Sequence, residues 1–208
     1  MVKDMENKDT LEIIFIRHAE TQYDDIGDRD PSDGELTANG EMQCARLGEK
    51  LKDLPIDAYI TSSLLRSFKT ATGVCKAKPD NPLLEICPEL VECGCTPGYY
   101  GCSEEYLRRY YKNTRMCPNL FGSKEYDFGC EEIEDNNIRA QKVIDYIQKR
   151  FTFGDRIAVF SHHGMLEYLI PTALGIKTRD FFFALDNISV TAVDICRDGN
   201  RVLRYVNK

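Results

Sequence analysis

The chain has 208 residues, of which 42% are hydrophobic, and this length and composition suit one domain with a sizeable core. Its formal net charge of -7 argues against a nucleic-acid partner, because such binding relies on a surface rich in Lys and Arg. No apolar run is long enough to span a bilayer, and the first ten residues lack the apolar stretch of a secretory signal. We therefore expect a cytoplasmic protein with no membrane partner.

The first 90 residues alternate between strand and helix patterns. Short apolar, β-branched runs indicate buried strands, and apolar residues at helical spacing indicate helices. The first of these strands ends abruptly in Arg17-His18. The predicted elements are a strand at 12–16, a helix from 37 to 51, a strand at 58–60, a helix introduced by Ser62-Ser63, and a strand at 83–86.

The pattern breaks down between residues 93 and 131, which are rich in Gly, Tyr and Cys. Such a stretch is typical of an inserted lid or cap, and we expect one helix within it, around 104–111. Regular patterns then return and continue to the end of the chain. They predict a helix at 133–151, a strand at 156–161 that ends in His162-His163, a helix from Gly164, and two strands at 188–195 and 202–206 around the hairpin signal Asp198-Gly199-Asn200.

This order of elements predicts a single α/β domain over residues 1–208. The expected architecture is a three-layer α/β/α sandwich with a mostly parallel sheet, a terminal antiparallel hairpin and an inserted lid subdomain at 93–131. Ligands of such sheets bind beyond the carboxyl ends of the strands. Because Arg17-His18 and His162-His163 both follow strands directly, they lie where that rule places a site.

Histidine and arginine at two neighbouring strand ends suit phosphoryl chemistry. The planar fork of arginine fits phosphate oxygens, and Arg66, at the start of its helix, would join Arg17 in that role. A neutral His18 imidazole can attack phosphorus, while a second, protonated imidazole on His162 can stabilise charge on the equatorial oxygens.

The leaving alkoxide needs a proton, which a carboxylic acid with a raised pKa can deliver. Glu92, which follows the third predicted strand, is placed by sequence order for that role. Glu20 and Glu89 are the competing candidates. An inserted Arg108-Arg109 pair would either contact a second anionic group of the substrate or form the exposed face of a short helix.

The sequence around these residues carries a resemblance to a known family, in segments that occur in the same order along almost the whole chain. The segments are FIRHAET at 15–21, LT with the following G and QCA at 36–45, YITSSLLRS at 59–67, PELVE at 88–92 and FSHHG at 160–164. Together they resemble the histidine phosphatase superfamily, which has the phosphoglycerate-mutase-like fold. Each segment alone is a weak signal, but their order and positions make the combination specific.

The resemblance implies a role for each candidate. His18 would be the phosphorylated nucleophile, and Arg17, Arg66 and His162 would form the phosphate pocket. Glu92 would protonate the leaving group and later activate water. The family uses no metal and no organic cofactor.

Two further residues belong to the implied substrate-binding set. Thr21 closes the first motif, and Asp24 stands where the family often has an asparagine that donates to phosphate. An ionised aspartate only accepts hydrogen bonds and would repel a phosphate. Asp24 therefore either points away from the pocket or indicates an unusual ligand.

These observations favour a metal-independent phosphatase that hydrolyses a phosphomonoester of a small molecule through a phosphohistidine on His18. One alternative is a phosphotransferase of the phosphoglycerate mutase type, which the short insertion between Glu92 and His162 disfavours. Another is a non-catalytic module that binds a phosphorylated ligand, which retention of the nucleophile and acid disfavours. The sequence leaves the substrate and the oligomeric state open.

The nine cysteines are expected to be reduced thiols, because their number is odd and no export signal is present. Cys44, Cys75 and Cys196 fall in helix or strand patterns and are expected in the core. Five others crowd into the insertion without the paired C-x-x-C spacing of common zinc sites, so thiols are favoured over metal. These five are Cys93, Cys95, Cys102, Cys117 and Cys130.

Overall fold

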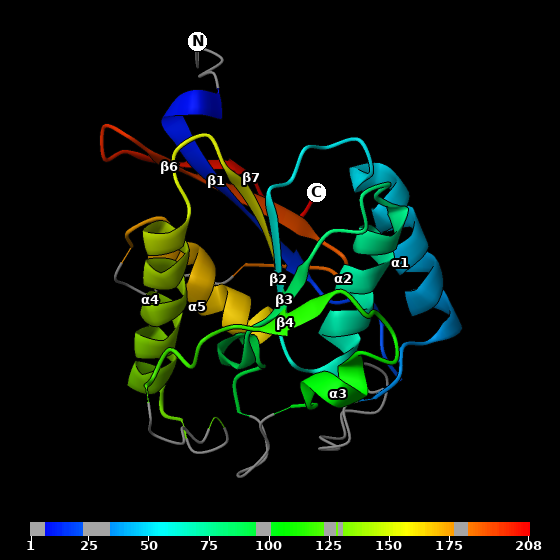
Figure 1. The fold of residues 1–208 in the computed structure, drawn as a ribbon. Coiled ribbons are helices and arrows are strands. Elements are labelled where there is room, and N and C mark those ends of the chain that lie inside the picture. Colours follow the sequence, from blue (N-terminus) through cyan, green and yellow to red (C-terminus); the bar gives the residue numbers. More distant parts are fainter. Residues whose placement is uncertain (1–6, 23–33, 95–100, 123–127, 129–130, 177–182) are drawn as a thin grey trace.

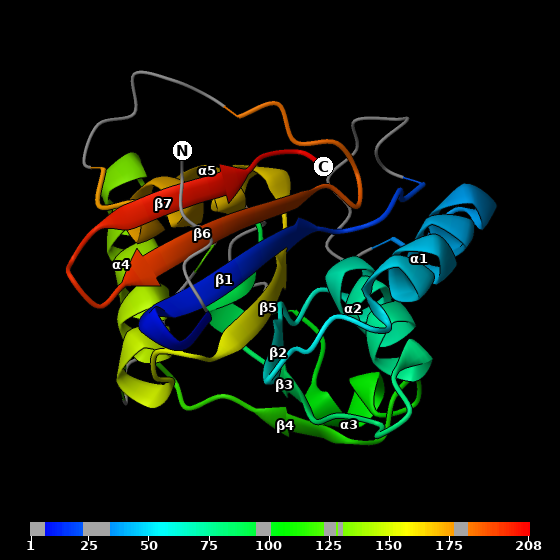
Figure 2. The same cartoon turned by 90° about the horizontal axis from the view of Figure 1, so that it is seen from above.

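A computed structural model of the protein describes residues 7–22, 34–94, 101–122, 128, 131–176 and 183–208. In these ranges seven strands form one mixed sheet, with helices on both faces (Figures 1 and 2). The α/β class and the mostly parallel sheet predicted from the sequence are confirmed. None of the described helices is both long and apolar enough to cross a membrane.

The strand order across the sheet is β4-β3-β2-β5-β1-β6-β7. β1 to β5 run parallel, and β6 runs antiparallel to both β1 and β7, which confirms the terminal hairpin. The strands are β1 (Thr10–Arg17), β2 (Ala58–Thr61), β3 (Leu84–Ile86), β4 (Thr114–Met116), β5 (Arg156–Ser161), β6 (Val190–Cys196) and β7 (Arg201–Tyr205).

The helices begin close to where the sequence predicts them. Thr37 is the N-cap of the first helix and accepts a hydrogen bond from the Gly40 amide at 2.9 Å, which satisfies one of the free amides of the first turn. The helices are α1 (Ala38–Leu51), α2 (Leu65–Ala77), α3 (Glu104–Leu107), α4 (Ile133–Arg150) and α5 (His163–Ala173), with short 3-10 turns at Asn7–Asp9 and Pro88–Leu90.

β1 shows how the central strands organise the core. Successive side chains of a strand point to opposite faces of the sheet. Ile13 and Phe15 pack in the cluster that includes α4 and α5, while Ile14 and Ile16 pack in the cluster that includes α1 and α2. All four side chains are fully buried, as the apolar run predicts for a central parallel strand.

The structure adds one element that the sequence pattern did not predict. Residues 114–116, inside the insertion, form β4 and pair in parallel with β3 at the edge of the sheet. Three residues are too few to show a strand period, so only the partner strand fixes their conformation. The helix expected at 104–111 is the shorter α3, and beyond it Tyr111 is buried in the core.

Candidate active site

The two strand-end histidines lie side by side. β1 and β5 pair in parallel with Arg17 opposite Ser161, so the next residues, His18 and His162, leave adjacent strands together. The His18 amide donates to the Ser161 carbonyl at 3.0 Å, and the two ring centroids are 5.1 Å apart. Since His18 is 4% exposed and His162 is fully buried, the predicted pairing of the strand ends is present in a largely desolvated environment.

The hydrogen bonds of His18 determine which ring nitrogen can react. Nδ1 lies 2.8 Å from the Ala19 carbonyl oxygen, which can only accept, so Nδ1 carries the proton and Nε2 keeps its lone pair. Burial lowers the pKa of His18 well below its usual value, and the positive charges of Arg66 and Arg17 lower it further. The ring is therefore neutral near pH 7 with a free lone pair on Nε2.

The main chain around His18 is held from two sides. On one side, the Asn187 side-chain amide and the Ile188 backbone amide both donate to the His18 carbonyl, at 3.2 and 3.3 Å. On the other, the Ala19 amide donates to the Thr70 hydroxyl at 2.9 Å, which anchors the loop to α2. The nucleophile candidate is thus fixed through backbone groups.

His162 differs from the sequence expectation in its charge. Burial is the main cause of a strongly lowered pKa, followed by the positive charge of Arg66, so the ring is neutral in this arrangement and not protonated. Its Nε2 lies 3.0 Å from the Ser62 hydroxyl, which already accepts from the Leu64 amide. That hydroxyl keeps one lone pair and one proton, and in the tautomer in which it donates to Nε2 the ring proton of His162 is on Nδ1. Within the described part of the chain Nδ1 is buried without a hydrogen-bond partner.

Arg17 and Arg66 supply the positive charge of the site. Arg17 ends β1, and its Nη1 donates to the Leu185 carbonyl at 2.8 Å. Arg66 is the second residue of α2, close to the positive end of the helix dipole. Each of the two arginines lowers the pKa of His18 and of His162. The two positive charges are therefore close to both imidazole rings. The predicted set of two histidines and two arginines is brought together.

The carboxylate of Glu92 lies against the first turn of α5, the helix that follows His162. Its Oε1 accepts from the amides of Cys93 at 2.8 Å and Met165 at 3.0 Å, and its Oε2 accepts from the Gly164 amide at 3.2 Å. A Cβ on residue 164 would lie 2.7 Å from Oε1, so this close approach requires glycine. The carboxylate is therefore fixed beside the second histidine by the amides of a helix N-terminus.

The two competing carboxylates are engaged elsewhere. Glu89 is 2% exposed and accepts from the Leu120 amide at 2.7 Å, so it joins the insertion to the 3-10 turn. Glu20 accepts from the Thr37 hydroxyl and the Asn39 side chain at the start of α1. Of the three carboxylates, Glu92 is the one whose partners include amides of the helix that follows His162.

Arg139 is a supporting residue that the sequence did not reveal. It lies on α4, is fully buried, and its Nη1 donates to the carbonyls of Glu89 at 3.1 Å and Val91 at 2.7 Å. Its Nη2 forms an ion pair with the buried side chain of Glu131 at 2.6 Å. Arg139 thus fixes the loop that carries Glu92. An arginine within a helical pattern gives no sequence signal for this role.

The structure describes Thr21 and Arg108 of the remaining predicted residues, but not Asp24. Thr21 is 1% exposed, and its backbone pairs with Leu36. Asp24 lies outside the described residues, as do Cys95 and Cys130. Arg108 forms an ion pair with Glu104 at 2.7 Å, which favours the helix-face interpretation for it. No group of three or more metal-binding side chains occurs in the described ranges.

The cysteines expected in the core are there. Cys44, Cys75 and Cys196 are all buried, at 4%, 0% and 3% exposed. Cys87 and Cys117 are also buried, whereas Cys93 and Cys102 are partly exposed. All seven described cysteines are free thiols.

The sequence model of the histidine phosphatase superfamily, branch 1, matches residues 13–208. A relative from Salmonella paratyphi A, "Probable phosphoglycerate mutase GpmB", is 37% identical over 88% of this chain and 85% of its own length. The chain belongs to the histidine phosphatase superfamily.

Two further similar proteins are named as phosphatases. "Phosphoserine phosphatase 1" of Hydrogenobacter thermophilus is 23% identical over 93% of this chain and 91% of its own length. A solved phosphoserine phosphatase from Entamoeba histolytica, in complex with phosphoserine, has a TM-score of 0.65 at 22% identity and covers 95% of this chain and 97% of that one. The structural match shows that the fold is shared.

Proposed function

We propose that this histidine phosphatase superfamily member hydrolyses a phosphomonoester through a phosphohistidine on His18. The observation that carries the proposal is the state of the His18 ring. Its Nδ1 proton is committed to the Ala19 carbonyl, burial keeps the ring neutral, and Nε2 is left as a nucleophile beside two arginines.

In the first half of the reaction the Nε2 lone pair attacks phosphorus, and the bond from phosphorus to the leaving oxygen breaks. Arg17 and Arg66 neutralise the phosphoryl oxygens, and the unpartnered Nδ1–H of His162 donates to one of them. The carboxyl of Glu92 gives its proton to the leaving oxygen. An alcohol departs and a phosphohistidine remains.

In the second half water attacks the phosphohistidine. The Glu92 carboxylate takes a proton from that water, the bond from Nε2 to phosphorus breaks, and inorganic phosphate leaves. The three amides around Glu92 suit this step, because a carboxylate accepts all three hydrogen bonds. In the first half the same group acts as the acid, so one carboxyl serves both steps in turn.

The proposed substrate class is a phosphorylated small molecule. Support comes from the names of the relatives, one a phosphoserine phosphatase, and from the Entamoeba structure that holds phosphoserine. The seven free thiols support action in a reducing compartment such as the cytoplasm, and no metal or organic cofactor is invoked.

The second candidate is a phosphoglycerate mutase. The relative from Salmonella, 37% identical over most of the chain, favours it. A mutase keeps water out and returns the phosphoryl group to another hydroxyl, so its activity depends on a bisphosphorylated primer. Release of inorganic phosphate without primer separates the two functions.

The test is hydrolysis of an aryl phosphate in the presence of EDTA, with wild type and the His18→Ala variant. We expect turnover that survives EDTA and falls by at least about 10³-fold in the variant, because the attacking group is gone. Rapid acid-free quenching with labelled substrate should capture a phosphohistidine in wild type only. Metal-dependent turnover, or turnover that persists in the variant, would contradict the proposal.

A further inference from the structure

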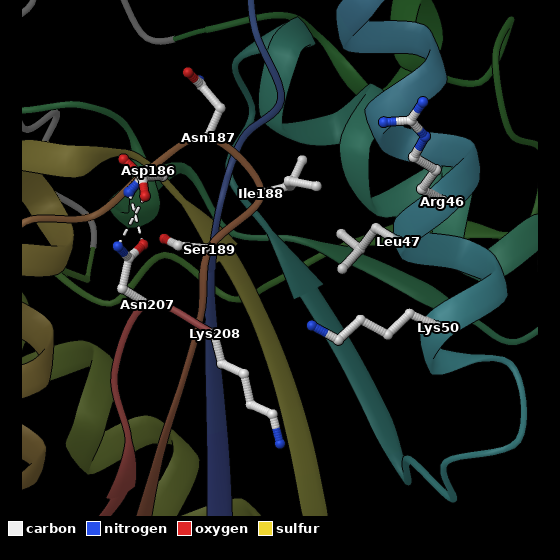
Figure 3. A pocket seen from close by; sticks show the side chains of 9 residues that line it. All are labelled: Arg46, Leu47, Lys50, Asp186, Asn187, Ile188, Ser189, Asn207 and Lys208. Carbon is white, nitrogen blue, oxygen red and sulfur yellow. Dashed lines mark hydrogen bonds between the residues drawn. The ribbon is translucent and has the colours of Figure 1, made fainter.

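A groove of about 290 Å³ lies between α1 and the segment that enters β6 (Figure 3). Leu47 of α1 and Ile188 face each other across it. Its volume is at the lower end of the range for small-molecule sites. The nine lining residues are Arg46, Leu47, Lys50, Asp186, Asn187, Ile188, Ser189, Asn207 and Lys208.

The charge of the groove is opposite to that of the protein. Arg46, Lys50 and Lys208 line it, in a chain whose net charge is -7. Arg46 and Lys50 are one helical turn apart on α1, and no ion pair engages either of them in the described part of the chain. The one acid in the lining, Asp186, already accepts from the Asn207 side chain at 2.9 Å. The groove therefore attracts anions.

A polar group in the lining also lacks a partner. Ser189 is 5% exposed, and among the residues that the structure describes its hydroxyl has no hydrogen-bond partner. A buried hydroxyl without a partner costs free energy, so such groups in native proteins usually serve a ligand or an ordered water. The groove thus combines three cations, the apolar side chains of Leu47 and Ile188, and the Ser189 hydroxyl, which is the composition of a binding site.

The groove is directly connected to the nucleophile through residues 186–189. Ile188 has a φ of +58°, a left-handed conformation that a β-branched side chain rarely adopts. In that conformation its amide reaches the His18 carbonyl at 3.3 Å, next to the Asn187 side chain at 3.2 Å. The Ser189 carbonyl accepts from the Arg17 amide at 3.2 Å. One side of this segment holds the catalytic loop and the other lines the groove.

We propose that this groove binds a small organic anion with a short apolar part, and that the bound anion holds residues 186–189 in the conformation that positions His18. The acidic group would contact Arg46 and Lys50, and the apolar part would lie against Leu47 and Ile188. By packing on Ile188 the ligand stabilises a strained backbone conformation that otherwise has to be maintained by the fold alone. The groove is thus an activating site, and this role rests on the proposed function of His18.

The binding test uses hexane-1-sulfonate, an anion with a short apolar chain that the enzyme cannot hydrolyse. We expect saturable shifts of the backbone amide signals of Lys50, Ile188 and Ser189 in NMR spectra. The shifts should be lost in the double variant Arg46→Glu/Lys50→Glu. They should persist in the control Lys76→Glu/Lys149→Glu, which makes the same change of charge at exposed sites on α2 and α4. Absence of groove shifts in wild type, or equal loss in both double variants, would overturn the proposed site.

The coupling test has two readouts on the same samples. With the groove saturated, we expect kcat for an aryl phosphate to rise by about fivefold, the lower end of ordinary coupling between sites, and the ring nitrogen signals of His18 to move. Neither change should occur in Arg46→Glu/Lys50→Glu. Binding that leaves both readouts unchanged would overturn the coupling. If the enzyme has no hydrolytic activity at all, the proposed function fails, but the amide and ring signals still decide whether the groove binds and reaches His18.

Discussion

The backbone of His18 and Ala19 is held by several neutral hydrogen bonds from neighbouring elements, whereas the loop of Glu92 is held in part by a buried ionised side chain. The carbonyl of His18 and the amide of Ala19 are both fixed by neutral hydrogen bonds from the β6 side and from α2. The loop before Glu92 is instead fixed by Arg139, whose charge is balanced by Glu131 in the interior.

This difference implies different responses to mutation. Several neutral hydrogen bonds share the task of holding the nucleophile, so the loss of one leaves the others in place. The Arg139 guanidinium alone donates to two carbonyls of the loop before Glu92, and its removal takes away the cation that faces the buried Glu131 carboxylate. We therefore expect the half of the site around Glu92 to be the more sensitive to substitutions of supporting residues.

The largest expected effect is a fall in kcat when Glu92, the proposed acid, is replaced. Glu92→Gln removes the proposed proton donor and base. The Gln oxygen can still accept from the amides of Cys93 and Met165, but its NH₂ group cannot accept from the Gly164 amide. We expect kcat for an alkyl phosphate to fall by about 10²- to 10⁴-fold and the free energy of unfolding to fall by about 1 to 3 kcal/mol. Steady-state kinetics with aryl phosphates of increasingly acidic leaving groups measures the role: the defect should shrink as the leaving group needs its proton less. A defect of constant size would assign proton donation to another group.

The next effect is on stability. Arg139→Met should lower the free energy of unfolding by about 3 to 5 kcal/mol, because Glu131 and two loop carbonyls lose their buried partner. Urea denaturation measures it. The matched control is Arg197→Met, which removes a surface ion pair to Asp9 at 3.3 Å and should cost about 1 kcal/mol or less. Equal losses in the two variants would refute the role of Arg139 as the main support of the loop.

Each residue that supports the backbone of His18 should contribute less to the free energy of unfolding than Arg139 does. Thr70→Val leaves the Ala19 amide without its hydroxyl acceptor, and we expect a loss of about 1 to 3 kcal/mol in the free energy of unfolding. Thr72→Val is the control, since that hydroxyl only donates to the Lys69 carbonyl within α2 at 2.8 Å. If both variants lose the same stability, Thr70 has no special part in anchoring the catalytic loop.

The smallest expected effect is a pH dependence shared by both histidines. Each has a pKa in the folded protein well below the ordinary value of 6.5, so the unfolded chain binds more protons as the pH falls. Stability is therefore fully present above pH 6.5 and is lost below it, by about 1 kcal/mol per histidine between pH 6.5 and 5.5. Urea titrations at these two pH values measure the loss, and His18→Gln/His162→Gln should reduce it. An unchanged slope in that variant would mean that other groups cause it.

The parts of the fold and site that the sequence predicted are those set by local pattern. Ile13 to Ile16 form an uninterrupted apolar run, so the strand and the position of His18 at its end follow from neighbouring residues. The same holds for His162 after β5. Parallel pairing of the two strands then brings the rings together, and no side-chain detail is needed for that step.

The parts that the sequence did not predict depend on contacts between distant residues. Arg139 meets the Val91 carbonyl 48 positions away, and Asn187 meets the His18 carbonyl 169 positions away. β4 is a strand only because β3 lies beside it. The hydrogen-bond partners of Glu20, Glu89 and Glu92 likewise come from distant elements and could not be read from spacing.

The position of β1 in the sheet has a consequence for how the protein is made. β1 is synthesised well before its neighbours on both sides, because β5 and β6 are formed by residues 156–161 and 190–196. Pairing across such sequence separations is slow, so the backbone edges of β1 stay unpaired and its apolar side chains stay unburied until then. We therefore expect nascent chains that end before residue 156 to lack the pairing of His18 with His162 and to be prone to aggregation and chaperone binding.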